Sequence, residues 1–312
     1  MRTASLSDQP AGTDRPARRP ATTQMAARKD RKEDDDPLRT QVRKIADDAG
    51  ALSVAVAYHD YETRTAWSFR GDEWFHAAST IKVPVLLGVF AAIARGELAL
   101  NARVHVRNRF LSVADGSSFR VGSSRDANAD VQQAIGKTMK VSDLAYHMIT
   151  TSSNLATNLL IDVVGIDAVR KTLADLNLDD GVEFRRGVED EHAFERGISN
   201  RCTADGMLRV LRAIEDRKAF SAQASEQMLD ILHAQEFRSG IPAGLPEGAK
   251  VANKTGEIST VAHDAGIVYL PRRKPYALVV LTEWDKDRSS GRKDTIARIS
   301  RAIYHHLAEK GD

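Results

Sequence analysis

Ser79-Thr80-Ile81-Lys82 opens the longest apolar run of the chain, Val83 to Ala94. Residues three apart lie on one face of a helix, so the Ser79 hydroxyl and the Lys82 amine would project together from its first turn. Lowering the pKa of a lysine from about 10.4 to 7 takes about 4.6 kcal/mol, and burial moves it by about 3 to 5 units. The run therefore predicts a buried helix with a candidate nucleophile beside a candidate base. A helix cap followed by a surface lysine is the alternative for this stretch alone.

The composition indicates a folded chain with balanced charge. Its 312 residues, 42% of them hydrophobic, suffice for a large core in one domain or two closely packed subdomains. The formal net charge is +2, so we expect neither nucleic acid nor an anionic membrane as partner. Cys202 is the single cysteine, and the nine histidines form no CxxC, HxH or HExxH pattern. We therefore expect no metal site. The sequence also contains no GxGxxG, P-loop or GxSxG motif, and we expect no cofactor and a monomer.

Residues 1–36 are poor in large apolar groups and end in the charge run Arg28 to Asp36. Such a segment buries too little surface to offset its ordering entropy, which predicts a disordered tail. It also lacks the apolar stretch of about 7 to 15 residues that a secretory signal needs. Val83 to Ala94 is too short to span a bilayer. We expect no export signal and no membrane span, and the compartment stays open.

Strand patterns lie at both ends of the chain. They predict a hairpin and a later three-stranded meander, at Leu52–Tyr58, Thr65–Phe69, Lys250–Thr255, Val261–Leu270 and Tyr276–Trp284. Helical spacing flanks them at Leu38–Ala49 and Asp294–Leu307. Antiparallel strands from the two ends can pair into one sheet. The predicted fold class is α/β, of the α+β kind: a five-stranded antiparallel sheet flanked by N- and C-terminal helices.

The middle of the chain predicts an inserted all-helical subdomain. Helical patterns begin near Val141, Leu155, Ile166, Thr203 and Ser221, whereas the charged stretch Gly181 to Arg201 predicts a long surface loop. We expect one domain over residues 37–312, with a sheet subdomain at 37–78 and 238–312 and a helical subdomain at 79–237. A cleft at their junction is the expected place for a site.

Two further motifs fall where such a cleft would need them. Ser152-Ser153-Asn154 lies at a break between two helices, where a hydroxyl and an amide can be fixed. Lys254-Thr255-Gly256 ends a strand, and Gly256 permits close approach of a ligand to the backbone. Taken singly, a helix cap and an exposed strand-end lysine are the simpler interpretations.

Together the motifs are specific. S-x-x-K, S-x-N and K-T-G occur in this order, the first two at helix starts and the third on a late strand, as in penicillin-recognising serine enzymes. The chain resembles class A β-lactamases and related serine hydrolases over roughly residues 38 to 308. Met148 to Leu160 and Phe75 to Ser79 are also similar to the family's second motif helix and to the approach to its nucleophile. The resemblance implies a β-lactamase/transpeptidase-like fold.

The resemblance also implies roles in acylation. Ser79 would attack the lactam carbonyl, with Lys82 as base or proton relay. Ser152 would pass a proton to the departing nitrogen, assisted by Lys254. The backbone N–H groups of Ser79 and Glu257 would form the oxyanion hole, where losing one donor costs about 2.7 to 4 kcal/mol.

Substrate binding follows from the same resemblance. Asn154 would bind the substrate side-chain amide and help hold Lys82, while Lys254 and Thr255 would receive the carboxylate. Family members often carry an arginine on the strand after K-T-G, but Val261 to Ala265 has none. His263 is the expected weak substitute.

Hydrolysis of the acyl-enzyme needs a further base. Class A enzymes use a loop glutamate followed by an asparagine, yet Gly187 to Glu195 contains no E-x-x-L-N pattern. Glu189 is our choice by its distance from Thr203, and Glu191 is the next. A solvated acidic loop remains the simpler interpretation for either.

The leading hypothesis is a serine β-lactamase acting on a small-molecule β-lactam. The alternative is a penicillin-binding D-alanyl-D-alanine peptidase or esterase with slow deacylation on a peptidoglycan-like substrate. A non-enzymatic β-lactam sensor is the third. The family usually works in the periplasm or outside the cell, whereas no signal peptide is visible.

Overall fold

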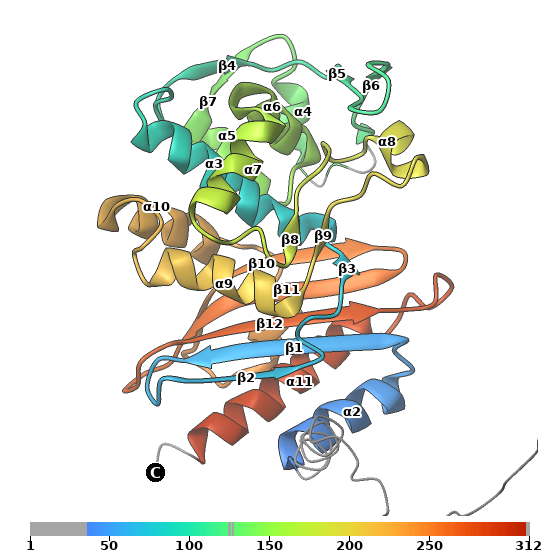
Figure 1. Cartoon of the computed structure of the whole chain (residues 1–312), viewed down its shortest axis with the longest axis vertical. Helices are drawn as coiled ribbons and strands as arrows, with labels where there is room; N and C mark the ends of the chain where they lie inside the picture. Colours follow the sequence, from blue (N-terminus) through green and yellow to red (C-terminus); the bar gives the residue numbers. More distant parts are fainter. Residues whose placement is uncertain (1–35, 124–125, 127, 310–312) are drawn as a thin grey trace, which may run out of the picture.

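A five-stranded antiparallel sheet joins the two ends of the chain (Figure 1). The computed structural model describes residues 36–123, 126 and 128–309. The strand order is β10-β11-β12-β1-β2. The strands are β1 (Ser53–Asp60), β2 (Thr65–Phe69), β10 (Lys250–Ile258), β11 (Val261–Tyr269) and β12 (Tyr276–Glu283). The predicted hairpin and meander meet where Ser53 lies opposite Glu283, so the predicted fold class is confirmed.

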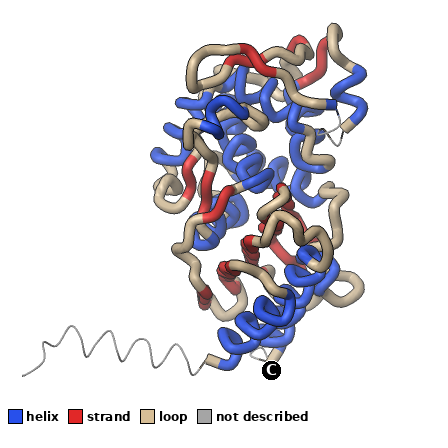
Figure 2. Tube along the Cα trace, turned by 90° about the vertical axis from the view of Figure 1, so that its right-hand side faces the viewer, coloured by secondary structure: helices blue, strands red, loops and turns tan. Residues whose placement is uncertain are grey.

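Helices α2 (Pro37–Ala49) and α11 (Arg292–Ala308) form one outer layer on the sheet. Figure 2 shows the strands between this helix pair, near the marked C-terminus, and the larger helical block. Pro37 stands in the first turn of α2, and the Asp36 side chain accepts the Leu38 N–H at 3.0 Å. The predicted disordered tail, residues 1–36, otherwise lies outside the described residues.

The helical block covers the other face of the sheet. Its longer helices are α3 (Lys82–Ala94), α5 (Val141–Thr150), α6 (Asn154–Val164), α7 (Ile166–Asp175), α9 (Ala204–Glu215) and α10 (Ala222–His233). Helices α9 and α10 pack on the strands, and α3 is buried along most of its length, as its apolar sequence predicts. Ser79, however, lies in a separate 3₁₀ turn, η1 (Ala78–Ile81), which leads into α3.

Short elements complete this block. They are β3 (Phe75–His76), β4 (Arg103–His105), β5 (Phe110–Leu111), β6 (Ser118–Phe119), α4 (Ala129–Gln133), β7 (Thr138–Lys140), β8 (Val182–Glu183), α8 (Glu191–Glu195) and β9 (Arg201–Cys202). The turn η3 (Ile241–Gly244) instead packs against α11. Strands β3, β9 and β8 form one small sheet, and β4–β7 and β5–β6 form two pairs.

The prediction of a long surface loop at 181–201 is wrong in part. The segment contains β8 and α8, and Arg186, Asp190 and Asn200 are buried. The Asn200 side chain accepts the N–H groups of Arg185 and Arg186 and donates to the Arg186 carbonyl. One amide thus satisfies the backbone of a buried bend, which a charge pattern cannot reveal.

Two apolar clusters lie on opposite faces of the sheet. The larger joins one sheet face to the helical block, and the smaller lies between the other face and helices α2 and α11. Each face of the sheet therefore contributes to one of the two cores. The predicted subdomain boundaries at residues 79 and 237 stay a prediction. None of the helices in the described ranges has the length and apolarity to cross a membrane.

Candidate active site

Turn η1 is pressed against the end of strand β10. A Cβ added at Gly256 would lie 3.1 Å from the Ser79 nitrogen and 3.0 Å from the Thr80 nitrogen. Only glycine fits so close an approach without displacing the neighbouring backbone. The Ser79 N–H and the backbone after Gly256 therefore lie at one junction, as an oxyanion hole formed by Ser79 and Glu257 requires.

Lys82 is buried at the start of α3, where it faces the second motif. Its Nζ donates to Ser152 O at 2.6 Å and to Asn154 Oδ1 at 2.7 Å, and lies 3.1 Å from Ser152 Oγ. Within residues 36–123, 126 and 128–309, Lys82 makes no hydrogen bond to Ser79. A neutral amine with two N–H bonds already made keeps its lone pair for the Ser152 hydroxyl.

Lys254 approaches the same hydroxyl from the sheet. Its Nζ donates to Ser152 Oγ at 3.0 Å and to the Thr255 carbonyl at 2.8 Å. Ser152 has a φ of 59° in the break between α5 and α6, which turns its side chain toward both amines. Ser152 Oγ is thus the atom that bridges the two lysines.

Both amines lose basicity in this setting. Burial, and next to it the charge of Lys254, holds the pKa of Lys82 well below its usual range, against the opposing effect of Asp126 and Glu189. Burial lowers the pKa of Lys254 to about 7, although the Asp264 carboxylate raises it. One neutral and one charged amine can therefore coexist near pH 7.

The start of α6 is fixed by two side chains. Ser153 Oγ caps it by accepting the Ala156 N–H at 3.1 Å. The buried Asp126 carboxylate accepts the N–H groups of Asn154 and Leu155 at 3.2 and 3.1 Å. A carboxylate at this end of a helix is favoured by the backbone dipoles, and it holds Asn154 in place.

Glu189 reaches the site from the loop before α8. Its Oε1 accepts from Asn154 Nδ2 at 2.6 Å, and its Oε2 accepts the Gly122 N–H at 3.1 Å. The preceding residue is held by Asn158 of α6, whose side chain exchanges two hydrogen bonds of 2.9 Å with the Val188 backbone. Of the two carboxylates weighed from the sequence, Glu189 is the one bound to Asn154.

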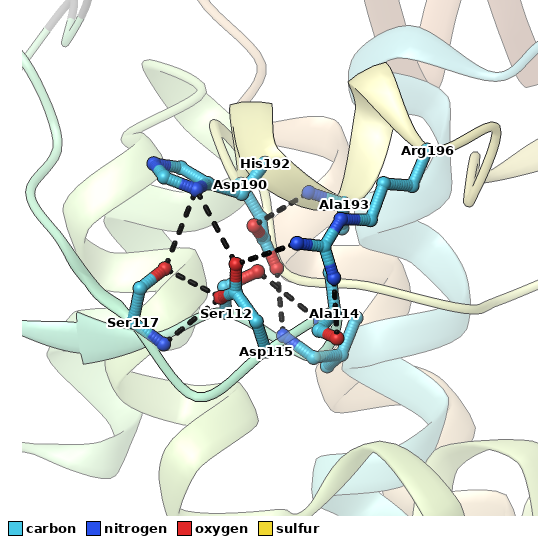
Figure 3. Close-up of polar contacts among 9 residues, drawn as sticks. Ser112, Ala114, Asp115, Ser117, Asp190, His192, Ala193 and Arg196 are labelled. Atoms are coloured by element: carbon cyan, nitrogen blue, oxygen red, sulfur yellow. Dashed lines mark hydrogen bonds and ion pairs between the residues drawn. The ribbon is translucent and has the colours of Figure 1, made fainter.

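A polar network fastens this loop to the β5–β6 hairpin (Figure 3). Asp190 accepts the N–H groups of Val113 and Ala193, at 3.0 and 3.1 Å. Arg196 pairs with Asp115 at 3.0 Å and donates to the Ala114 carbonyl. The loop that carries Glu189 is thus held from two sides.

The open cavity has two lobes that meet at Ser79. One lobe of about 280 Å³ contains Glu189 and the apolar side chains of Phe194 and Ile258. The other, of about 200 Å³, contains Ser152, Thr255, Gly256 and Lys293. Ser79, Asn154 and Glu257 line both. The structure therefore gathers the motif residues around one cavity, with Lys82 and Lys254 buried beside it.

Comparisons with known proteins agree with this arrangement. A model of the beta-lactamase enzyme family matches residues 37–307. The chain belongs to the beta-lactamase enzyme family. The β-lactamase of Sphaerobacter thermophilus DSM 20745 is similar at 26% identity, with a TM-score of 0.72 over 86% of this chain and 98% of that one.

Two other solved structures share the fold of this β-lactamase family member. PBP-A is 23% identical, with a TM-score of 0.72 over 87% of this chain and 96% of its own. The ancestral class A β-lactamase GNCA is 24% identical, with a TM-score of 0.74 over 86% and 99%.

One expectation for this β-lactamase family member is wrong. His263 was expected to replace the missing arginine, but its Nδ1 accepts the Thr282 N–H and its Nε2 lies 2.9 Å from the His76 carbonyl. Burial lowers the pKa of His263 to about 4, so the ring is neutral at pH 7 and both nitrogens are occupied. It supplies no cation to the cavity.

The sequence interpretation missed Lys293, in the first turn of α11. This lysine lines the second lobe and pairs with Glu257 at 2.8 Å, while Arg292 pairs with the other oxygen of Glu257 at 3.0 Å. No local motif marks Lys293, because only the packing of α11 on the sheet brings its first turn to the cavity.

Proposed function

We propose that the chain is a serine β-lactamase that hydrolyses the lactam amide through an acyl-enzyme on Ser79. The observation that carries the proposal is the placement of Ser152 Oγ, 3.1 Å from Lys82 Nζ and 3.0 Å from Lys254 Nζ, beside a cavity that Ser79 also lines. Family membership supports the reaction class, and the site residues supply the chemistry.

In acylation, Ser79 Oγ forms a bond to the lactam carbonyl carbon while its proton passes to the Lys82 amine, whose lone pair turns to Ser79 from the Ser152 hydroxyl. The carbonyl oxygen becomes an oxyanion that the N–H groups of Ser79 and Glu257 bind. The C–N bond then breaks, and Ser152 gives its proton to the departing nitrogen. Ser152 regains a proton from Lys82, which restores the free amine.

Deacylation requires a base for water on the side of the first lobe. Glu189 lines this lobe with Ser79 and is fixed by Asn154. We assign Glu189 to take a proton from the attacking water, which forms a bond to the acyl carbon and releases Ser79.

Substrate binding uses the second lobe. Thr255 and Lys254 receive the carboxylate, and Lys293 supplies the exposed positive charge at the rim. Asn154 lines both lobes, and its Nδ2 group, which has two N–H donors and gives one to Glu189, would donate to the substrate amide.

A penicillin-binding peptidase or esterase with slow deacylation is the second candidate. Both carboxylate oxygens of Glu189 already accept hydrogen bonds, so an attacking water would have to share this acceptor with Asn154 and Gly122. A related structure is an acyl-enzyme complex of a PBP-A mutant with penicillin G. This candidate shares the acylation steps and differs only in the lifetime of the adduct.

Burst kinetics with a chromogenic cephalosporin, combined with intact-protein mass, tests the proposal. Sustained turnover with a short-lived adduct of one acyl group per chain supports the β-lactamase. A single stoichiometric burst supports the slow-deacylation candidate. Ser79→Ala is expected to form no adduct, and an adduct of unchanged stoichiometry in that variant would exclude Ser79 as the nucleophile.

The base is tested by a matched pair of variants. Glu189→Ala is expected to acylate normally and keep its adduct, because only the water-activating group is lost. Glu191→Ala serves as the control, since Glu191 lines the same lobe and was the other candidate from the sequence. Unchanged turnover in Glu189→Ala would eliminate this assignment.

A further inference from the structure

His76 fixes the turn that carries Ser79. Its Nδ1 accepts the N–H of Ala78, two residues later, at 3.0 Å. Ala78 has a φ of 45°, in the left-handed region that a non-glycine residue seldom adopts. A side-chain acceptor two residues earlier holds this conformation as an Asx turn does.

His263 ties the same segment to the central sheet. Because its Nδ1 accepts the Thr282 N–H at 3.1 Å, its neutral ring carries hydrogen on Nε2. That Nε2–H donates to the His76 carbonyl at 2.9 Å. The His76 imidazole therefore binds the backbone of the turn before Ser79, and the His263 imidazole links that turn to β11 and β12.

Burial keeps both rings neutral. Burial, assisted by the nearby Arg186 guanidinium, lowers the pKa of His76 to about 4, and burial lowers the pKa of His263 to the same value. The Ala78 N–H lies 3.0 Å from His76 Nδ1, and Arg186 Nη2 lies 3.5 Å from His76 Nε2. A neutral ring can accept at one nitrogen only, so the shorter bond from Ala78 takes the Nδ1 lone pair, places the hydrogen on Nε2 and leaves Arg186 without an acceptor there. The His76 Nδ1 lone pair is thus available at neutral pH.

We propose that His76 and His263 are positioning residues that aim the Ser79 backbone N–H at the substrate carbonyl. The proposal rests on acyl transfer at Ser79 and adds what orients its oxyanion donor. The peptide plane between Ala78 and Ser79 carries that N–H, and the Ala78 N–H bond fixes the plane before it. The backbone of Gly256 limits movement of the Ser79 N–H from the other side. The approach is so close that a Cβ added at Gly256 would lie 3.1 Å from the Ser79 nitrogen.

Paired substitutions separate the hydrogen bond from packing. His76→Asn keeps an acceptor for an N–H two residues later, whereas His76→Leu removes it. We expect the rate of penicillin acylation, measured by intact-protein mass, to fall by on the order of 10- to 100-fold in His76→Leu. His76→Asn should stay within about threefold of the parent chain.

A second pair and a remote histidine complete the design. His263→Gln keeps a donor toward the His76 carbonyl and should acylate faster than His263→Leu. His59→Leu is the control, because His59 is a buried histidine of β1 that lines neither lobe. It should lower Tm without slowing acylation.

The outcomes distinguish this proposal from the proposed function. Parent-like acylation in His76→Leu, or no rescue by asparagine, overturns the role of His76 while the acyl-enzyme stands. If the parent chain takes up no penicillin, the proposed function fails. Hydrogen exchange at the Ala78 amide then tests the role of His76 separately. Faster exchange in His76→Leu than in His76→Asn supports the bond, and equal exchange overturns it.

Discussion

Lys82, Ser152 and Lys254 show how burial converts ordinary residues into a proton pathway. Neither lysine has a carboxylate within ion-pair distance in the described ranges; each is bound by neutral oxygens. Their charged forms are therefore poorly compensated, and both pKa values fall. A hydroxyl between two such amines can accept from one and donate to the other.

The acylation rate should have a bell-shaped pH profile. Lys82 accepts a proton only as a free amine, so kcat/KM falls on the acid side. Lys254 attracts an anionic substrate only as a cation, so kcat/KM also falls as pH rises through about 7. Stopped-flow measurements on Lys254→Arg, which stays charged, should show the alkaline limb shifted upward. The limb should not move in Lys250→Arg, an exposed lysine on the same strand; an unmoved limb in both variants contradicts the assignment.

Lys293 should select for substrates with a carboxylate. Lys293→Met is expected to raise KM for such lactams about threefold to tenfold, on the order of 1 kcal/mol, because the side chain is half exposed and its field is screened. Steady-state kinetics should show little change in kcat. Lys286→Met, on the exposed loop before α11, is the matched control. A KM equal to that of the control would remove Lys293 from the binding site.

At the scale of elements, the loop from 181 to 201 depends on helix α6. Asn158 binds the Val188 backbone twice, and the next residue is Glu189. The β5–β6 hairpin holds the far side of this loop through Asp190 and Arg196 (Figure 3). The position of the proposed base is therefore set by elements distant from it in sequence.

Asn158→Leu should loosen this loop. It leaves one donor and one acceptor of Val188 unpaired, at a cost of about 1 to 3 kcal/mol for a buried group. Thermal unfolding should show the loss, and the penicillin adduct should live longer while acylation stays close to normal. Val163→Ala, at an exposed position of the same helix, should change neither. An adduct of ordinary lifetime in Asn158→Leu would show that the loop holds Glu189 without this amide.

The short motifs and the sheet could be predicted from the sequence because each depends on local spacing. Ser152, Asn154 and Lys254 were located by three-residue patterns, and their common cavity followed from pairing strands of the two ends. The role of Lys293 could not be predicted, since it depends on how α11 packs on the sheet. The bond from His76 to Ala78 is local, but histidine is not among the residues whose side chains mark such turns. The prediction of a surface loop at 181–201 failed because a charged segment can be buried when one amide, here that of Asn200, satisfies its backbone.

At the scale of the whole molecule, the sheet separates a catalytic side from a supporting side. The candidate site opens among the helical block, the ends of β10 and β11 and the first turn of α11, while α2 and the rest of α11 cover the opposite face. Ile303 of α11 is fully buried in the supporting cluster and lines neither lobe.

Ile303→Ala should therefore reduce stability without changing acylation. Truncating a fully buried isoleucine costs about 2 to 5 kcal/mol. Chemical denaturation should report this loss, while the acylation rate well below Tm should match that of the parent chain. Leu52→Ala, at a position 64% exposed, should have little effect on either. A slower acylation in Ile303→Ala would mean that the two faces of the sheet are coupled.

The pairing of β1 with β12 also governs how the chain can be made. Ser53 is synthesised well before its partner Glu283, because residues 54–282 of the chain lie between them. Until then the nascent β1 presents an open edge, with unpaired N–H and C=O groups beside apolar side chains. Closure of the sheet is thus postponed until β12 has been synthesised, and release of a chain truncated before β12 would favour aggregation.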